Sequence, residues 1–247
     1  MNKSDLYIYG RHTVEEALEE QPENIDKVFL RNTLKNDSIG NVMELASRNR
    51  IPVSHVPGPK LYDLVGNVND QGIVALMSAV PYMDYGTWFD EKLDLSTNPA
   101  VLMLDEVEDP HNVGAIVRTA AAAGINALMV PKHRQAPINA AVYKTSAGTA
   151  DRIPIVRIGN MNQTIMDLKD EGFWIAGLDQ NGNDPLWEQK FDVPMAFIIG
   201  NEASGISQKT LEHCDFHIAI PMHNRVPSLN ASVSAAILCY EWLRQRA

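Results

Sequence analysis

Short apolar segments alternate with helical segments from residue 100 to the C-terminus, and this alternation limits the possible folds more than any other feature. Apolar runs typical of buried strands are predicted at 100–105, 125–130, 154–158, 173–178, 195–199 and 216–220. Helices are predicted at 110–123, 138–147, 160–171, 207–213 and 229–246. Since strands that alternate with helices form parallel sheets covered on both faces, we predict an α/β fold with a mostly parallel sheet for residues 99–247.

The N-terminal part shows a shorter alternation of its own. Strands are predicted at 6–9, 27–30, 52–56 and 73–78, and helices at 12–20, 37–48 and 60–65. Residues 1–80 are therefore expected to form a small, separate α/β domain. Residues 81–98 are acidic, contain Pro81 and Gly86, and lack periodicity, which predicts an interdomain linker, although the aromatic residues in this stretch indicate that part of it packs on a domain.

Composition limits the class of protein. Hydrophobic residues make up 45% and charged residues 21% of the 247 residues, as in ordinary globular proteins. No apolar run approaches the roughly 20 residues that span a bilayer, and the first residues do not resemble a signal peptide, so we expect a cytoplasmic protein without membrane contact. The two cysteines and seven histidines show no ligand spacing, so no metal is expected.

The net charge of −10 argues against a strongly basic nucleic-acid surface. No long segment is basic overall, so any contact with RNA must rest on a local patch of positive charge. The candidates for this patch are Arg118, Lys132, Arg134, Lys144 and Arg225. The alternative is that these side chains are scattered over the surface.

Three predicted strand ends carry unusual residues, and ligands of open α/β sheets bind beyond the carboxyl ends of strands. After 100–105, the helix at 110–123 carries Arg118 on a face of mostly small residues. After 195–199, Gly200 precedes a loop with Glu202 and Gly205. Taken singly, the first segment is slightly better explained by an arginine on a solvated helix face. The second is a weak motif that a tight strand–helix turn would also explain.

The third strand end leads into the last helix. Ser228 or Asn230 is expected to cap this helix, which is the simpler interpretation of either residue alone. The helix is predicted to bury an apolar stripe made of Val233, Ala236, Ile237, Tyr240 and Leu243. The segment Asp179-Gln180-Asn181-Gly182-Asn183 begins like a calcium loop but lacks its later residues, so we expect a turn there.

Together and in this order, the three segments resemble the SpoU/TrmH family of RNA ribose 2′-O-methyltransferases. The motifs are Asn112-x-Gly114-x-x-x-Arg118, Gly200-Asn201-Glu202-x-x-Gly205, and Ile220-Pro221-Met222 followed by Ser228-Leu229-Asn230-x-Ser232-Val233. Residues 1–80 are similar to the family's N-terminal substrate-binding module, a small ribosomal-protein-like α/β fold, at Gly10-Arg11-His12 and Gln71-Gly72-Ile73-Val74. Asp70 departs from the pattern, because the family usually has His there.

The resemblance implies a deep trefoil knot in the C-terminal part, a homodimer, and a bent S-adenosylmethionine that leaves as S-adenosylhomocysteine. It assigns a role in catalysis to Arg118, which would help the ribose hydroxyl lose its proton, and to Asn112, Glu202, Ser228 and Asn230. It assigns cofactor binding to Gly200, Ile220, Leu229, Asn201, Met222 and Ser232. From the sequence itself, RNA binding is predicted at Arg11, Lys132, Arg134, Lys144 and Arg225.

The most similar subgroup methylates a guanosine ribose in 23S rRNA, which makes ribosomal RNA the expected partner. Three alternatives stay open. The chain could be a tRNA 2′-O-methyltransferase of the same family, or a catalytically silent RNA-binding assembly factor that kept the fold. The third, a small-molecule α/β enzyme, would suit the acidic balance but has no supporting motif.

Overall fold

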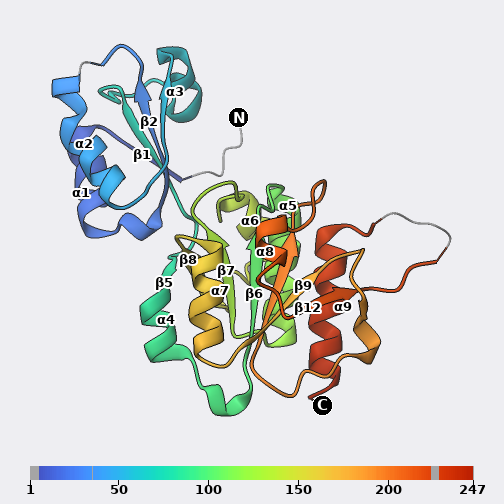
Figure 1. The fold of residues 1–247 in the computed structure, drawn as a ribbon. Coiled ribbons are helices and arrows are strands. Elements are labelled where there is room, and N and C mark those ends of the chain that lie inside the picture. Colours follow the sequence, from blue (N-terminus) through green and yellow to red (C-terminus); the bar gives the residue numbers. More distant parts are fainter. Residues whose placement is uncertain (1–5, 35, 224–227, 247) are drawn as a thin grey trace. The chain divides into compact units, whose positions relative to one another are not determined.

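The computed structural model describes residues 6–34, 36–223 and 228–246, and the chain divides into two compact units. The first unit combines the chain up to Tyr82 with Pro137–Ala141, and the second combines Met83–Ala136 with the chain from Val142 onward (Figure 1). No helix in the part of the chain that the structure describes has the length and apolarity needed to cross a bilayer.

The first unit is built on a four-stranded sheet in the order β1-β4-β2-β3. Strand β4 is antiparallel to both of its neighbours, and β2 and β3 are parallel. The elements are β1 (Leu6–Tyr9), α1 (Arg11–Glu20), η1 (Pro22–Asn24), β2 (Ile25–Arg31), α2 (Asn36–Arg48), β3 (Val53–Val56), α3 (Gly58–Val65) and β4 (Ile73–Met77).

The two faces of this sheet are covered by different helices. Helices α1 and α2 lie on one side and α3 on the other (Figure 1). Side chains alternate along a strand, so Val28 and Leu30 of β2 join the core under α1 and α2, whereas Phe29 and Arg31 point to the α3 side. Leu61 of α3 is fully buried on that second side.

The second unit is built on an eight-stranded sheet in the order β10-β12-β9-β11-β6-β7-β8-β5, and every neighbouring pair is parallel. This confirms the predicted α/β class with a mostly parallel sheet. The strands are β5 (Met83–Asp84), β6 (Ala100–Asp105), β7 (Ala127–Pro131), β8 (Ile155–Ile158), β9 (Trp174–Leu178), β10 (Asp184–Pro185), β11 (Met195–Gly200) and β12 (Phe216–Ala219).

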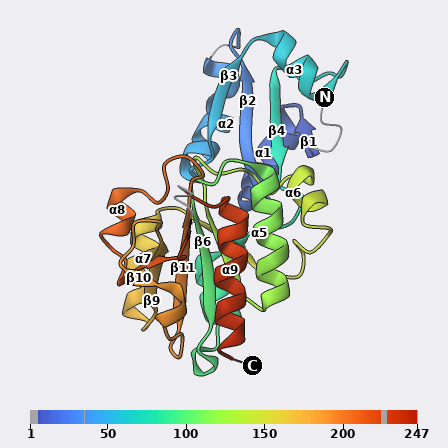
Figure 2. The same cartoon turned by 90° about the vertical axis from the view of Figure 1, so that its right-hand side faces the viewer.

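Helices cover both faces of this sheet. They are α4 (Tyr85–Lys92), α5 (Pro110–Ala123), α6 (Ala140–Thr145), α7 (Met161–Asp170), α8 (Gln208–Leu211) and α9 (Ala231–Arg244), with the short turns η2 (Leu95–Thr97) and η3 (Leu186–Glu188). Helices α5 and α9 pack along each other over one face, as Figure 2 shows. Trp88 of α4 and Ile165 of α7 join the core of the opposite face.

Part of the stretch 81–98 packs on the second unit, as its aromatic residues indicated, and does not act as a linker. Residues 83–92 form β5, which pairs with β8, and α4, whose Trp88 is fully buried. Tyr85 and Phe89 lie with Trp88 in an aromatic cluster with ring centroids 6.1 to 6.4 Å apart. Since aromatic side chains bury large apolar surfaces, tertiary packing orders a stretch in which local periodicity is weak.

The predicted buried stripe of the last helix was wrong. Val233 is 46% and Tyr240 52% exposed, and the residues that α9 buries are Ala231, Ala235, Leu238, Cys239, Glu241 and Trp242. The helix carries apolar residues on more than one side, so periodicity could not choose between two stripes. The buried carboxylate of Glu241 accepts two hydrogen bonds from Arg244, at 2.7 and 2.8 Å, which explains why this side can contain an acid.

Candidate active site

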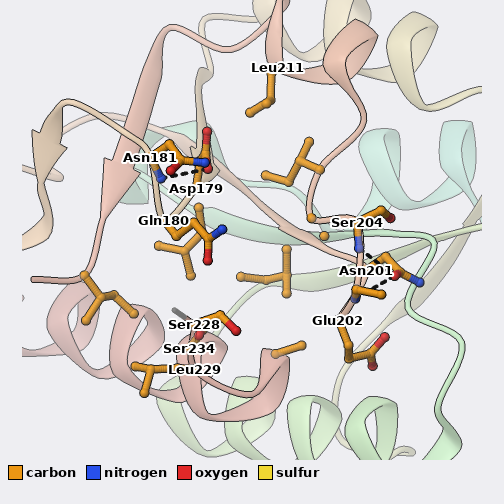
Figure 3. Close-up of a pocket in the computed structure, with 18 of the residues that line it drawn as sticks. Asp179, Gln180, Asn181, Asn201, Glu202, Ser204, Leu211, Ser228, Leu229 and Ser234 are labelled. Carbon is orange, nitrogen blue, oxygen red and sulfur yellow. Dashed lines mark hydrogen bonds between the residues drawn. The ribbon is translucent and has the colours of Figure 1, made fainter. Parts of the chain in front are cut away.

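A cavity of about 550 Å³ lies at the carboxyl edge of the parallel sheet (Figure 3). Three loops and the start of α9 form it, and the loops follow β9, β11 and β12. The lining residues are Leu178–Asn181, Ile199–Ile206, Gln208, Leu211, Ile220, Met222, Ser228, Leu229, Ala231 and Ser234. In the strand order, β9 neighbours both β11 and β12, so loops distant in the sequence meet at one place.

The loop after β11 folds back onto the end of its own strand. Asn201 and Gly205 exchange two backbone hydrogen bonds of 3.0 and 2.9 Å. A Cβ atom at Gly200 would lie 2.3 Å from the backbone of both Gly205 and Ile206, so only glycine fits there. The Asn201 side chain accepts from the backbone of Ala203 and Ser204 and donates to the Glu106 carbonyl, so it shapes the loop.

A chain of side-chain hydrogen bonds joins the three predicted motifs. The Asn112 amide nitrogen donates to Oε1 of Glu202 at 2.7 Å, and the Asn230 amide nitrogen donates to Oδ1 of Asn112 at 3.0 Å. Asn112 is only 8% exposed and has both ends of its amide engaged, so its orientation is set by its partners. Glu202 also lines the cavity. Its second oxygen takes part in no hydrogen bond within the described ranges.

Asn230 links this chain to the backbone of α9. Its Oδ1 accepts from the backbone nitrogen of Ser232 at 2.9 Å and of Val233 at 3.4 Å, which makes Asn230 the helix N-cap. Ser232 also donates its hydroxyl to the same oxygen at 2.6 Å. One amide therefore caps α9 with its oxygen and positions Asn112 with its nitrogen.

These two roles can be separated by mutation. Asn230→Asp keeps the capping oxygen and places a negative charge at a helix N-terminus, so the free energy of unfolding should stay within about 0.5 kcal/mol of the wild type. The carboxylate cannot donate to Asn112, so the activity that the resemblance implies, methyl transfer, should fall about tenfold or more, in line with the loss of a positioning contact. Asn230→Ala removes both roles and should also cost about 1 kcal/mol of stability. Urea unfolding and initial rates measure both effects, and equal rates for the wild type and Asn230→Asp would contradict the positioning role.

Arg118 lies apart from the cavity lining. It is exposed on α5, less than two turns beyond Asn112, and it forms no hydrogen bond or ion pair with the residues that the structure describes. Nearby Gly114 lets α6 approach closely, because a Cβ there would lie 2.6 Å from Cβ of Thr145 and 2.9 Å from the Val142 carbonyl oxygen. The arginine is thus free to bind a group that approaches from outside the chain.

Of the residues to which the resemblance assigns cofactor binding, Gly200, Asn201, Ile220, Met222 and Leu229 line the cavity. Ser232 does not, since its hydroxyl is bound to Asn230, and Ser234 of the same helix lines the cavity instead. Ser228, assigned to catalysis, also lines the cavity.

The residues assigned to RNA binding lie on different elements of the chain. Arg134 pairs with Glu106 at 3.2 Å and is 75% exposed, so the pair is weak and can open. Lys144 is exposed in the last turn of α6, and Lys132 follows β7. Arg11 begins α1 in the first unit, where its backbone nitrogen donates to Gln71. Arg225 lies outside the described residues.

The loop after β9 was missed as part of the site. Asp179, Gln180 and Asn181 line one side of the cavity, opposite Asn201, Glu202 and Ser204 (Figure 3). The segment is a turn as predicted, since Gly182 donates its backbone nitrogen to the Asp179 carbonyl at 3.0 Å. Its position after a predicted strand was the available signal, because it obeys the same strand-end rule as the other three segments.

Comparison with known families and sequences gives consistent results. The family described as "SpoU rRNA Methylase family" matches residues 99–240, and the family described as "RNA 2'-O ribose methyltransferase substrate binding" matches residues 7–83. A TrmH family tRNA/rRNA methyltransferase of Staphylococcus epidermidis is 37% identical over 242 residues, covering 98% of this chain and 96% of that protein. A Staphylococcus aureus protein of the same description is also 37% identical, covering 98% and 97%.

Solved structures share the fold. The SpoU methyltransferase AviRb from Streptomyces viridochromogenes, in complex with AdoMet, has a TM-score of 0.61 at 21% identity. The match covers 98% of this chain and 91% of the AviRb chain. The TrmH/SpoU tRNA modifying enzyme of A. aeolicus has a TM-score of 0.55 at 31% identity, covering 63% and 78%. With two family matches and relatives 37% identical along nearly its whole length, the chain belongs to the SpoU/TrmH family of RNA methyltransferases.

Proposed function

We propose that this protein transfers a methyl group from S-adenosylmethionine to a ribose 2′-hydroxyl, in a guanosine of 23S rRNA. The observation that carries the proposal is the hydrogen-bonded chain Glu202–Asn112–Asn230 at the rim of the 550 Å³ cavity. It joins all three family motifs, and a catalytically silent assembly factor would not need to keep it. The proposed place of action is the cytoplasm, where ribosomal RNA is found.

The cavity fits S-adenosylmethionine in size and chemistry. Its volume of about 550 Å³ lies within the range of small-molecule sites. Leu211, Ile220 and Leu229 contribute apolar side chains to the lining, which suit a purine ring. The carboxylates of Asp179 and Glu202 suit the two positive charges of this molecule, its sulfonium and its ammonium group.

Bound in this cavity, the cofactor would supply an electrophilic methyl group. The chain must orient this methyl donor and stabilise the charge that develops on the substrate. The loop 200–206 and the start of α9 would hold the donor and orient it toward the rim. Asn112, fixed by two partners, would keep Glu202 directed into the cavity. A guanidinium remains protonated at neutral pH, so Arg118 would act by stabilising the developing alkoxide or by holding a phosphate of the substrate.

Two features of the family complete the proposal for the second unit. One is a trefoil knot in the C-terminal part, which is consistent with the position of β11 between β9 and β6 in the sheet. The other is a homodimer. Its support is the exposed apolar face of α9, where Val233 and Tyr240 are 46% and 52% exposed beside the half-buried Ala236 and Ile237.

The homodimer can be tested at this face. Light scattering of the wild type at about 10 µM should give twice the chain mass of 27.4 kDa. The double variant Val233→Glu/Tyr240→Glu should give the single mass, because like charges buried without partners strongly oppose association. Met166→Arg on α7, which changes a side chain 43% exposed, is the matched control and should stay dimeric. A monomeric wild type, or a dimeric double variant, would refute this arrangement.

The proposed function is tested by methyl transfer to defined RNA. Purified protein and labelled S-adenosylmethionine are incubated with 23S rRNA from a strain that lacks this gene, and in parallel with tRNA. We expect label only in 23S rRNA, at one ribose that mapping assigns to guanosine. Label in tRNA alone would favour the second candidate, which the 31% identity to the A. aeolicus tRNA modifying enzyme supports. No label in either RNA, despite tight cofactor binding, would contradict the function.

A further inference from the structure

An arginine in the first unit is held at an unusual site. Oδ1 of Asp70 accepts from Nη2 of Arg31 and from the backbone nitrogen of Gly72, each at 2.6 Å. The Asp70 side chain is only 8% exposed, whereas that of Arg31 is 38% exposed. The buried carboxylate is fixed by its own turn, so it fixes the guanidinium in turn.

The guanidinium keeps unused donors. Its bonds to the described residues use Nη2 alone, and Nε is buried without a partner. Arginine carries five N–H donors in a rigid planar arrangement that matches the oxygens of a phosphate. With one edge held by Asp70 and the side chain partly open to solvent, Arg31 is oriented in advance for a second, anionic partner.

The start of helix α3 adds positive potential beside Arg31. A Cβ at Gly58 would lie 3.7 Å from Nε and 3.8 Å from Cδ of Arg31, so the arginine side chain passes the first turn of α3. This helix has no side-chain cap and no acidic residue in its first turn, and Lys60 stands there instead. A helix N-terminus favours negative charge, so a lysine at this position is unfavourable unless an anion binds nearby.

Aromatic side chains lie on the same side of the sheet as Arg31. The register pairs Tyr9 with Val74 and Val74 with Phe29, so Tyr9, Phe29 and Arg31 point to the α3 face. Tyr9 is 42% exposed, and Tyr62 of α3 is 59% exposed. Phosphate-binding donors next to exposed rings are the combination that binds unpaired RNA, through its backbone and its bases.

We propose that Arg31, held by Asp70 beside the N-terminus of α3, binds a backbone phosphate of the substrate RNA. Lys60 adds charge to the site, and Tyr9 and Tyr62 offer stacking surfaces for the adjoining bases. The inference rests on the proposed function, since it takes the methylated RNA as the ligand. It gives the first unit a defined contact with the substrate.

The test uses the full-length protein and deproteinised 23S rRNA from a strain that lacks the gene, with filter binding measured between 50 and 200 mM salt. Arg31→Gln should bind about tenfold more weakly at low salt, and the slope of log affinity against log salt should fall by about 0.7 to 0.9. Arg31→Lys should restore the slope but only part of the affinity, because lysine keeps the charge and loses the planar donors. Arg48→Gln, which changes an exposed arginine of α2 on the opposite face, should stay within twofold of the wild type.

A second variant is needed because Arg31→Gln leaves Asp70 buried and unpaired, which can unfold the unit. Arg31→Gln/Asp70→Asn removes both charges, and it should show the same weaker RNA binding with wild-type thermal unfolding. Affinities and slopes equal to those of Arg48→Gln in both Arg31 variants would overturn the proposal. The proposal would also be overturned if the Arg31 variants lost binding of inorganic phosphate while their affinity for RNA stayed unchanged. Failure of the proposed function would give a different result: the wild type would bind RNA through Arg31 but transfer no methyl group.

Discussion

Replacing Arg118 with Ala is expected to lower the rate of methyl transfer at least a hundredfold and to leave the affinity for S-adenosylmethionine within twofold of the wild type. Arg118 does not line the cavity, so the cofactor should bind normally. The ribose hydroxyl must lose a proton during transfer, and removal of a positive group that stabilises the developing charge typically costs a factor of about 10² to 10³. Initial rates with labelled cofactor and titration calorimetry measure the two quantities.

The design includes two controls. Arg118→Lys keeps the charge without the planar donors, and a partial rate would indicate an electrostatic role, whereas a rate as low as that of alanine would indicate a geometric one. Arg152→Ala removes another exposed arginine of the second unit and should not change the rate. Arg118 has no partner among the described residues, so stability should change by less than about 0.5 kcal/mol. Retention of more than a tenth of the wild-type rate in Arg118→Ala would exclude the catalytic role.

Replacing Gly200 with Ala is expected to cost about 3 kcal/mol of stability and to weaken cofactor binding at least tenfold. The new Cβ would lie 2.3 Å from two backbone atoms, which cannot rotate away as a side chain can. The loop 201–205 would have to move, and with it several residues that line the cavity. Overpacking in a tight site costs about 1–3 kcal/mol, and contact with backbone puts this case at the upper end. Thermal unfolding and calorimetry measure both effects.

Two other glycines serve as controls for this substitution. Gly205→Ala meets no atom within 4 Å, but its φ of +70° is unfavourable for alanine, so a loss of about 1 kcal/mol is expected. Gly40→Ala, in helix α2, also meets no neighbour within 4 Å and should stabilise the first unit by about 0.5–1 kcal/mol. If Gly200→Ala behaved like Gly205→Ala, the close approach of the loop to β11 would not be essential.

Most secondary structure could be predicted from the sequence, because its signals are local. Strand β6 and helix α5 begin and end where they were predicted, at 100–105 and 110–123. An unbroken apolar run marks a strand buried on both faces, and Asp109 followed by Pro110 marks a helix start. The order and spacing of the three motifs are equally local in the sequence, and they indicate the family that the comparisons show.

Only the tertiary structure decided which faces and loops meet. The turn at Asp179 enters the site because β9 lies beside β11 and β12, and α9 buries Leu238 and Trp242 because that side meets α5 and the sheet. The pairing of Arg31 with Asp70 joins residues 39 positions apart. Periodicity and capping act over a few residues and cannot rank two apolar stripes of one helix or pair two distant loops. Those choices depend on strand order and on the packing of whole layers, which arise from many contacts between distant parts of the chain.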